Sequence, residues 1–276
     1  MFVAELGNNS VSIVDLAARH VLGRLTGLDE PQGIAFEPTT NTFYVANGGD
    51  GSLRLYDGAD FSQVGRINLG ADADNVRVDP QTHRVYVGYG SGAIAVIDAS
   101  TRKKIADIPL RGHPESFQLD PATPRIFVNV PTMNTIEVLS RESPPADSRW
   151  LTRDSHANFP MSIDEPNHRL LVGFRQPARL QSIDMQTGKP LGFTDTCGDA
   201  DDIFVDTRRK WVHVICGNGF VDTYSMSGET FERIARLNTT VGSRTGLLLP
   251  ELDRLVVAVR ATNKRPASIW ILRPGR

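Results

Sequence analysis

Short apolar runs alternate with clusters of Gly, Pro, Asp, Asn and Ser along the whole chain. One complete unit is visible over residues 74–110, where the pattern predicts strands at 75–79, 85–88, 93–98 and 104–109. Short runs rich in β-branched and aromatic residues, bounded by turn-forming residues, are typical of strands rather than helices. The pattern therefore predicts an all-β protein with a helix content near zero.

The same unit recurs at a nearly constant spacing. A valine lies inside the second apolar run of each unit, 41 to 44 residues from the next one: Val3, Val45, Val87, Val128, Val172, Val214 and Val257. Four antiparallel strands in about 40–45 residues is the period of a propeller blade. We therefore predict a single β-propeller domain over residues 1–276, with seven blades of four antiparallel strands and units beginning near residues 2, 43, 84, 125, 169, 211 and 254.

The strand count is incomplete at both ends. Naming the strands of a unit a to d, the chain opens on a strand b at Phe2 and closes on a strand c at 269–272. With strand a nearest the propeller axis, the first blade lacks its innermost strand and the last lacks its outermost. We expect an N-terminally shortened form of a longer chain that also carried a signal peptide, because unpaired strand edges invite aggregation. The alternatives are a natural open ring and a six-bladed closure that leaves out the last two strands.

Several segments resemble the YVTN-repeat, or YncE-like, family of bacterial propellers. They are residues 43–47 (Phe-Tyr-Val-Ala-Asn), 84–88 (Arg-Val-Tyr-Val-Gly) and 95–98 (Ala-Val-Ile-Asp). The resemblance spans the whole chain, although Ser140 and Ser225 replace the acidic residue that closes strand c in other units. It implies a periplasmic or secreted protein when full-length, and it says little about what is bound.

Composition and charge narrow the classes of partner. The formal net charge is −2, so no large basic field is present to hold phosphate backbones, and we expect no nucleic-acid partner. No stretch approaches the roughly 20 apolar residues of a membrane-spanning helix. Met1 leads directly into strand-like residues without a basic flank, so the sequence as it stands shows no signal peptide. We expect a monomer that binds a small ligand or a protein.

The two cysteines flank a predicted hairpin. Strands at 201–206 and 211–216 set Asp201 roughly opposite Cys216, so that Cys197 in the preceding loop can fold back beside Cys216. A disulfide and two free thiols both fit this pattern. A two-cysteine metal site is weaker, because the sequence has no C-x-x-C spacing and no histidine beside either cysteine. The resemblance to an exported family favours the disulfide.

Antiparallel strands place the d–a and b–c loops on one side of each blade, which we call the mouth face, and the a–b and c–d turns on the other, the turn face. The turns, such as 37–41 and 79–83, read as structural. Loops on a rigid scaffold commonly carry function. The d–a loops supply these candidate ligand-binding residues: Glu30, Gln32, Asp72, Asp74, Asn75, His113, Glu115, His156, Asn158, Asp199, Asp201, Asp202 and Arg244.

The b–c loops add further charges to this face, including Arg175, Arg179, Arg260, Lys264 and Arg265. Acidic groups concentrate at 72–74 and 199–202, and basic groups at 244 and 260–265, so the opening could orient an anionic ligand. Each residue also has a structural reading. Asp and Asn before a strand commonly cap a turn, isolated histidines are usual on surfaces, and Arg244 could pair with a neighbouring carboxylate.

Three functions compete. The first is a non-enzymatic binding scaffold of the cell envelope, favoured because the chain has no G-x-S-x-G, H-E-x-x-H or Walker motif. The second is a metal-dependent hydrolase or lactonase with Ca²⁺ or Mg²⁺ at the channel mouth. Its candidate ligands are Glu30, Asp74, Asn75, Glu115 and Asp201. The third, a quinone or haem protein, is weakest, since there is no C-x-x-C-H motif and only three tryptophans could be modified.

Overall fold

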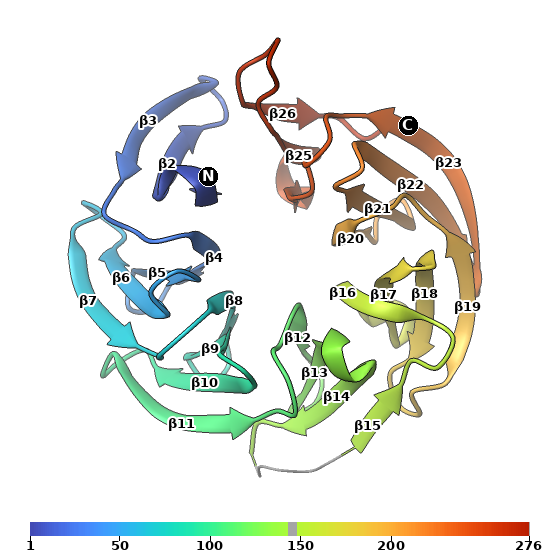
Figure 1. The fold of residues 1–276 in the computed structure, drawn as a ribbon, viewed down its shortest axis with the longest axis horizontal. Helices are drawn as coiled ribbons and strands as arrows, with labels where there is room; N and C mark the ends of the chain where they lie inside the picture. The colour runs from blue at the N-terminus through green and yellow to red at the C-terminus, as the bar shows by residue number, and fades with distance from the viewer. Residues whose placement is uncertain (143–147, 276) are drawn as a thin grey trace. The chain divides into compact units, whose positions relative to one another are not determined.

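Strands make up nearly all the regular structure in the computed structural model, which describes residues 1–142 and 148–275 (Figure 1). Within these residues the helical elements are four 3-10 turns: η1 (Leu6–Asn8), η2 (Pro131–Met133), η3 (Glu165–Asn167) and η4 (Pro250–Leu252). The strands form seven antiparallel sheets, and the fold is a seven-bladed β-propeller. The all-β prediction is confirmed. No helix in the described part of the chain is long and apolar enough to span a membrane.

The chain divides into two compact units. Unit 1 consists of Met1–Leu119, Thr123–Met133 and Glu137–Ser148, and unit 2 of Asp120–Ala122, Asn134–Ile136 and Arg149–Arg276. The first three sheets belong to unit 1, each with its strands in sequence order. Their strands are β1 (Phe2–Glu5), β2 (Ser10–Asp15) and β3 (His20–Leu25); β4 (Pro31–Glu37), β5 (Thr42–Asn47), β6 (Ser52–Asp57) and β7 (Gln63–Asn68); and β8 (Ala73–Asp79), β9 (Arg84–Tyr89), β10 (Ala93–Asp98) and β11 (Lys103–Pro109).

The fourth sheet has the order β12-β13-β14-β15. Its strands are β12 (Phe117–Leu119), β13 (Arg125–Val130), β14 (Thr135–Ser140) and β15 (Ser148–Leu151). The last three sheets belong to unit 2. Their strands are β16 (His156–Asp164), β17 (Arg169–Gln176), β18 (Ala178–Asp184) and β19 (Pro190–Asp195); β20 (Ala200–Asp206), β21 (Trp211–Cys216), β22 (Phe220–Ser227) and β23 (Thr230–Asn238); and β24 (Gly246–Leu249), β25 (Arg254–Val259) and β26 (Ser268–Leu272).

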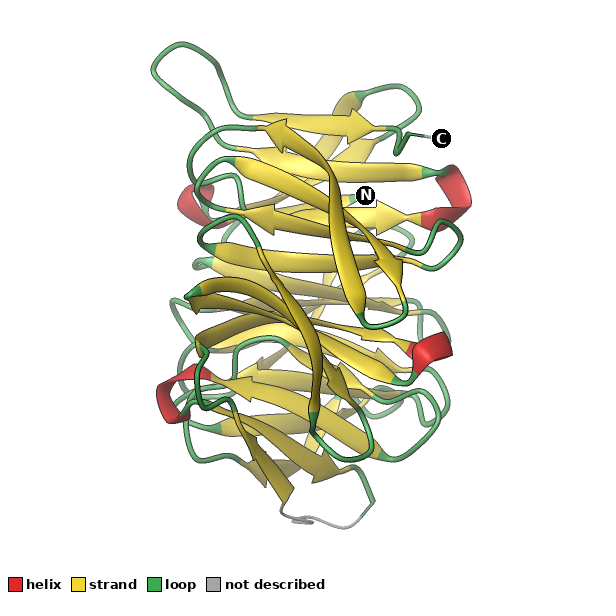
Figure 2. Cartoon of the chain, turned by 90° about the vertical axis from the view of Figure 1, so that its right-hand side faces the viewer, coloured by secondary structure: helices red, strands yellow, loops and turns green. Residues whose placement is uncertain are grey.

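The first and last sheets each have three strands, as predicted. The first blade consists of strands b, c and d, and the last of strands a, b and c. Within unit 1, Figure 1 shows β4 and β8, the a strands, along one edge of successive sheets, and the d strands β7 and β11 along the opposite edge. Figure 2 shows the strands in yellow, with the loops and 3-10 turns at their ends. Loops at one end of each blade therefore share a face with those of its neighbour in the same unit.

The middle strands of each blade supply the core. In β9 and β10 the central residues are buried, whereas the d strand β11 is exposed apart from Ile108. Blades pack through both faces of these strands: in unit 1, Tyr44 and Leu55 of one blade lie in the same cluster as Val85 and Val87 of the next. Burying a side chain of this size contributes about 1.5–3 kcal/mol. Because apolar residues occupy successive positions of strands b and c, both faces of a blade can pack against neighbouring blades.

Acidic residues at the ends of the a strands organise the turn face. Glu37 accepts hydrogen bonds from the Thr40 backbone N–H (2.7 Å) and from His83 Nδ1 (3.1 Å) in the next blade. Asp79 likewise accepts from Arg141 Nη1 (2.6 Å). Burial alone would raise the pKa of Glu37, but its hydrogen bonds outweigh burial and lower that pKa to about 2. These acids close their own turns and bind the adjacent blade, in agreement with the structural interpretation of this face.

Candidate functional site

The mouth-face ends of several a strands contain a β-bulge. The pairing register shifts between Pro31 and Ile34, Ala73 and Val76, Asn158 and Met161, and Ala200 and Asp202. The bulges therefore contain the candidates Gln32, Asp74, Asn75 and Asp201. A bulge leaves its extra residues unpaired and re-aims their side chains. This local irregularity explains how residues of a regular strand reach the mouth face.

The bulge in β20 corrects one expectation from the sequence. Asp201 was expected roughly opposite Cys216, but Ala200 is the residue that pairs with Cys216. Asp202 pairs with Ile215, so Asp201 is the extra residue of the bulge. The prediction was wrong by one position because strand alternation assumes an unbroken register.

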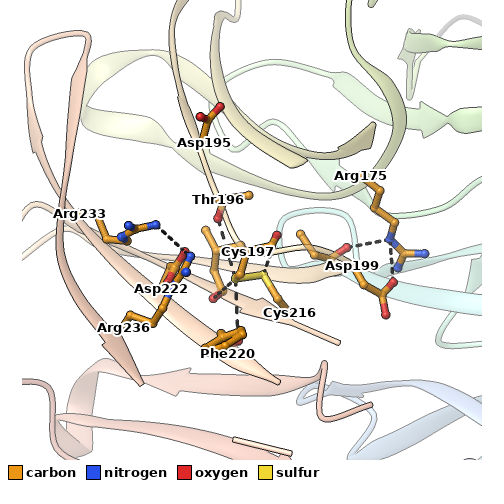
Figure 3. Close-up of a disulfide and its surroundings, with 12 residues drawn as sticks. Arg175, Asp195, Thr196, Cys197, Asp199, Cys216, Phe220, Asp222, Arg233 and Arg236 are labelled. Carbon is orange, nitrogen blue, oxygen red and sulfur yellow. Dashed lines mark hydrogen bonds and ion pairs between the residues drawn. A yellow bond between two sulfur atoms is a disulfide. The ribbon is translucent and has the colours of Figure 1, made fainter. Parts of the chain in front are cut away.

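Four charged side chains of unit 2 form one connected group, which we call the mouth cluster: Arg175, Asp199, Asp201 and Arg244. Arg175 bridges both aspartates, through Nε to Asp199 Oδ1 (3.2 Å) and through Nη2 to Asp201 Oδ1. Arg244 Nη2 lies 3.2 Å from the other oxygen of Asp199. Figure 3 shows Arg175 beside Asp199. Residues from the end of β17 and from the two d–a loops that flank the sixth blade thus converge.

Packing fixes the position of Arg175. Its guanidinium lies 3.5 Å from the centre of the Phe159 ring, and its Nε also donates to the Ala200 carbonyl (3.1 Å). A cation over an aromatic face contributes about 0.5–2 kcal/mol. Phe159 itself belongs to the bulge of β16. The bulges of two successive blades therefore position the two sides of one ion-pair network.

The Cys197–Cys216 disulfide lies directly beside the mouth cluster (Figure 3). It joins the d–a loop before β20 to the last residue of β21, with a Cα–Cα distance of 5.8 Å. Both cysteines are buried. Asp199 follows Cys197 by two residues and Gly217 follows Cys216 directly, and the Gly217 N–H donates to the Asp199 carbonyl (2.7 Å). The disulfide thus anchors the backbone that carries Asp199.

The side chains of the mouth cluster become less exposed from Arg244 towards Arg175. The side-chain exposed fraction is 40% for Arg244, 34% for Asp199, 25% for Asp201 and 20% for Arg175. Burial raises the pKa of Asp201, and the positive charges of Arg175 and Arg244 oppose this increase without cancelling it. A carboxyl group with a pKa raised by desolvation, beside partly exposed arginines, marks a candidate functional site, although structural ion-pair networks show the same signature.

The other candidates of unit 2 have structural partners. Asp202 Oδ2 accepts from the Gly246 N–H (2.8 Å) at the start of β24. His156 Nδ1 lies 3.1 Å from Asn134 Oδ1, and the buried Asn158 donates to the Thr135 carbonyl (2.9 Å). These three residues connect β16 and β20 to the neighbouring blades, so the mouth cluster retains Asp199, Asp201 and Arg244 from the sequence candidates.

The candidates of unit 1 contact neighbouring loops. His113 Nδ1 lies 2.6 Å from the Gly90 carbonyl and 3.5 Å from Asp72 Oδ2. The Glu30 N–H donates to Asn9 Oδ1 (2.9 Å), and Gln32 Nε2 packs against Gly48. The Glu115 N–H donates to the Asn129 carbonyl (3.0 Å). Asp74 and Asn75 occupy the bulge of β8.

The cation-site hypothesis stays a prediction. Across residues 1–142 and 148–275, no three His, Cys, Asp or Glu side chains are arranged to hold a metal ion. Of the candidate ligands, Asp201 is bound to Arg175.

The comparisons with known proteins establish the fold and nothing further. No protein-family model and no curated protein matches the chain. A hydrazine synthase structure from Kuenenia stuttgartiensis matches with a TM-score of 0.83 at 16% identity, over 99% of this chain and 92% of that one. A mitotic checkpoint complex structure gives 0.84 at 14%, over 99% and 84%. The Cps50 (Swd1) β-propeller domain of Myceliophteria thermophila gives 0.72 at 10%, over 88% and 86%. At such low identity these matches establish a β-propeller, which can carry unrelated functions.

Proposed function

We propose that this chain is a non-enzymatic binding scaffold of the cell envelope that, as a monomer, holds a small ligand or a partner protein at its mouth face. The mouth cluster carries the proposal. It joins two arginines and two aspartates from three different connections on a rigid sheet framework, and it leaves Arg244 and Asp199 partly exposed. Charged groups that are positioned in advance can bind a partner without a large ordering cost.

The outer ion pair of the cluster favours binding. A single contact of 3.2 Å joins Arg244 to Asp199 at the exposed edge. Exposed pairs of this kind contribute about 0–1 kcal/mol, so a ligand can replace either partner at little cost. An arginine that gains a bidentate carboxylate or phosphate forms a stronger, directional contact. The inner ion pair of Arg175 and Asp201 would hold the loops in place while the outer pair of Arg244 and Asp199 separates.

Two observations support a location in the cell envelope. The chain holds a buried disulfide, and disulfides persist in oxidising compartments such as the periplasm and the extracellular space. The sequence also resembles the exported YVTN-repeat, YncE-like propellers. We therefore propose that the full-length protein is periplasmic or secreted and belongs to that family.

Site-directed photo-cross-linking in envelope extracts tests the binding face. A photoreactive side chain is placed at Thr245, exposed on the mouth face, or at Lys189, exposed on the turn face. We expect cross-linked products from position 245 that Arg244→Ser and Asp199→Asn reduce at least tenfold, and few from position 189. Equal cross-linking at both positions, or products unaffected by the two substitutions, would exclude the mouth face as the binding surface.

A further inference from the structure

Two mouth-face loops of the last blade carry a concentration of positive charge. The d–a loop at 239–245 contains Arg244, and the b–c hairpin at 260–267 contains Arg260, Lys264 and Arg265. Neither segment contains an acidic residue, although the whole chain has a net charge of −2. We call these segments the basic loops. In Figure 1 the hairpin is the dark red loop that extends beyond β25 and β26.

Hydrogen bonds join the bases of the two loops. The Thr240 hydroxyl donates to the Arg260 carbonyl (3.0 Å), and the Arg260 N–H donates to the hydroxyl of the buried Ser243 (2.9 Å). Gly242 has φ +86°, and a Cβ at that position would lie 2.9 Å from Arg260 Cδ. The Arg260 side chain therefore lies across Gly242, and the two loops act as one surface.

The same surface is continuous with the mouth cluster. The Gly242 N–H donates to the Gly217 carbonyl (2.6 Å), and Arg244 Nε lies 3.3 Å from the position that a Cβ on Gly217 would occupy. Arg244 and Arg260 thus flank one backbone hydrogen bond. At the tip of the hairpin, the Thr262 N–H donates to the Arg265 carbonyl (2.9 Å), which closes a turn that presents Lys264 and Arg265.

Most of these positive charges have no ion-pair partner among the described residues. In the part of the chain that the structure describes, Arg260, Lys264 and Arg265 form no ion pair, and all residues of 260–267 are exposed. Arg244 has the single outer contact with Asp199. Uncompensated like charges on adjacent loops raise the local potential, which attracts and steers an anionic partner.

An apolar side chain lies among the cations. Val241, in the first basic loop, is 78% exposed, the largest exposed fraction among the exposed large hydrophobic residues of the described chain. A free phosphate gains nothing from such a contact, whereas a peptide with both acidic and apolar side chains gains from both. The surface therefore fits a protein segment rather than a bare anion.

We propose that the basic loops bind an acidic segment of a partner protein, in which Asp or Glu side chains flank an apolar residue that packs on Val241. This proposal rests on the proposed function, because it names the partner class for the same face. Arg260, Lys264 and Arg265 attract the segment, and Arg244 donates hydrogen bonds to one of its carboxylates in place of Asp199.

A labelled short peptide of alternating acidic (Asp, Glu) and apolar (Val, Leu) residues tests the proposal by fluorescence anisotropy and stopped-flow kinetics. Its counterpart with Asn and Gln is the uncharged control. The test variant is R260S/K264S/R265S. The matched control variant is K103S/K189S/R208S, which removes the same charge from exposed turn-face positions. V241S tests the apolar contact separately.

We expect binding of the acidic peptide and not of its amide counterpart. R260S/K264S/R265S lowers the association rate constant at least tenfold, and the loss diminishes at high salt, because peripheral charges act mainly on association. V241S instead speeds dissociation severalfold at every salt concentration. The turn-face control binds as the wild type does.

Three outcomes overturn the proposal: equal binding of acidic and amide peptides, equal effects of the two triple variants, or binding of an oligonucleotide or phosphatidylglycerol vesicles in place of the peptide. The test is independent of the cross-linking experiment. If the peptide fails to bind while Arg244→Ser still reduces cross-linking from position 245 at least tenfold, the acidic-segment proposal fails and the scaffold function stands. Equal cross-linking from the two faces rejects the scaffold function itself.

Discussion

At the scale of single residues, Gly217 determines where the Asp199 carboxylate can lie. A Cβ at position 217 would overlap Asp199 Oδ2 and lie 2.8 Å from Asp199 Cγ. Because the overlapping group is the end of a side chain, the backbone can stay in place while the carboxylate moves. Gly217→Ala is therefore a selective way to displace Asp199 from both arginines of the mouth cluster.

We expect Gly217→Ala to fold with a loss of at most about 1 kcal/mol in the free energy of unfolding. The Nε–H resonances of Arg175 and Arg244 should shift in ¹⁵N-resolved NMR spectra, since both guanidinium groups lose Asp199. Gly198→Ala is the matched control, because the three atoms nearest to a Cβ there all belong to Asn218, the closest at 3.3 Å. Unchanged arginine resonances in Gly217→Ala would show that Asp199 does not hold the cluster together.

A second residue, His213, links burial to acid sensitivity. It is 2% exposed in β21, and its Nδ1 lies 3.0 Å from the Thr223 hydroxyl. Burial lowers the pKa of His213 to about 4, against about 6.5 in an unfolded chain. Between these two values the unfolded state binds more protons than the folded state. The free energy of unfolding therefore falls as pH decreases from 6.5 towards 4.

The expected loss over this pH range is about 2–3 kcal/mol. Tryptophan fluorescence during urea unfolding measures it, since the Trp211 ring lies 6.4 Å from His213. His213→Gln should have a weaker dependence on pH between 6.5 and 4, whereas His168→Asn, at an exposed position, should retain that of the wild type. If His213→Gln and the wild type lose stability in parallel, the buried histidine does not cause the acid sensitivity.

At the scale of strands, the sequence predicts position better than register. Strand a of the third blade was expected at 75–79 and is observed at Ala73–Asp79, with its bulge at Asp74 and Asn75, where the added part meets the predicted strand. Alternation and turn residues locate a strand because they reflect burial and chain reversal. They do not reveal a bulge, which depends on contacts with the neighbouring strand. The one-residue error at Asp201 has this origin.

The same limit explains the incomplete prediction of the site. Asp199, Asp201 and Arg244 were identified as candidates because they lie in d–a loops. Arg175 was recognised as a b–c loop cation, but its two aspartate partners and the Phe159 ring were not foreseen. The two ion pairs join one blade to the next, and the Phe159 contact joins the ends of two strands of the same blade, so no pattern along a single strand encodes them. The glycine after Cys216 was a possible signal, because glycine permits close approach of a neighbouring side chain.

At the scale of the whole molecule, the repeat predicted the seven blades because the blades use the same apolar strands b and c, which are buried in the five four-stranded blades. A net charge near zero concealed an uneven distribution along the chain, in which the basic loops contain no acidic residue and the segments 72–74 and 199–202 contain no basic one. Periodicity therefore predicts the scaffold, and departures from periodicity in the loops locate the candidate site.

The disulfide affects the unfolding of the molecule as a whole, because it acts on the unfolded chain. Cys197 and Cys216 are 19 residues apart, and closing a loop of about that length lowers the entropy of the unfolded state by the equivalent of about 3 kcal/mol. Reduction should lower the free energy of unfolding of unit 2 by this amount. All three tryptophans, Trp150, Trp211 and Trp270, lie in unit 2, so their fluorescence in urea with and without dithiothreitol measures its unfolding.

The double variant C197S/C216S should respond to urea like the reduced wild type and be insensitive to dithiothreitol. An oxidised and a reduced wild type with the same unfolding midpoint would contradict a stabilising role, and would remove one of the two arguments for an oxidising compartment.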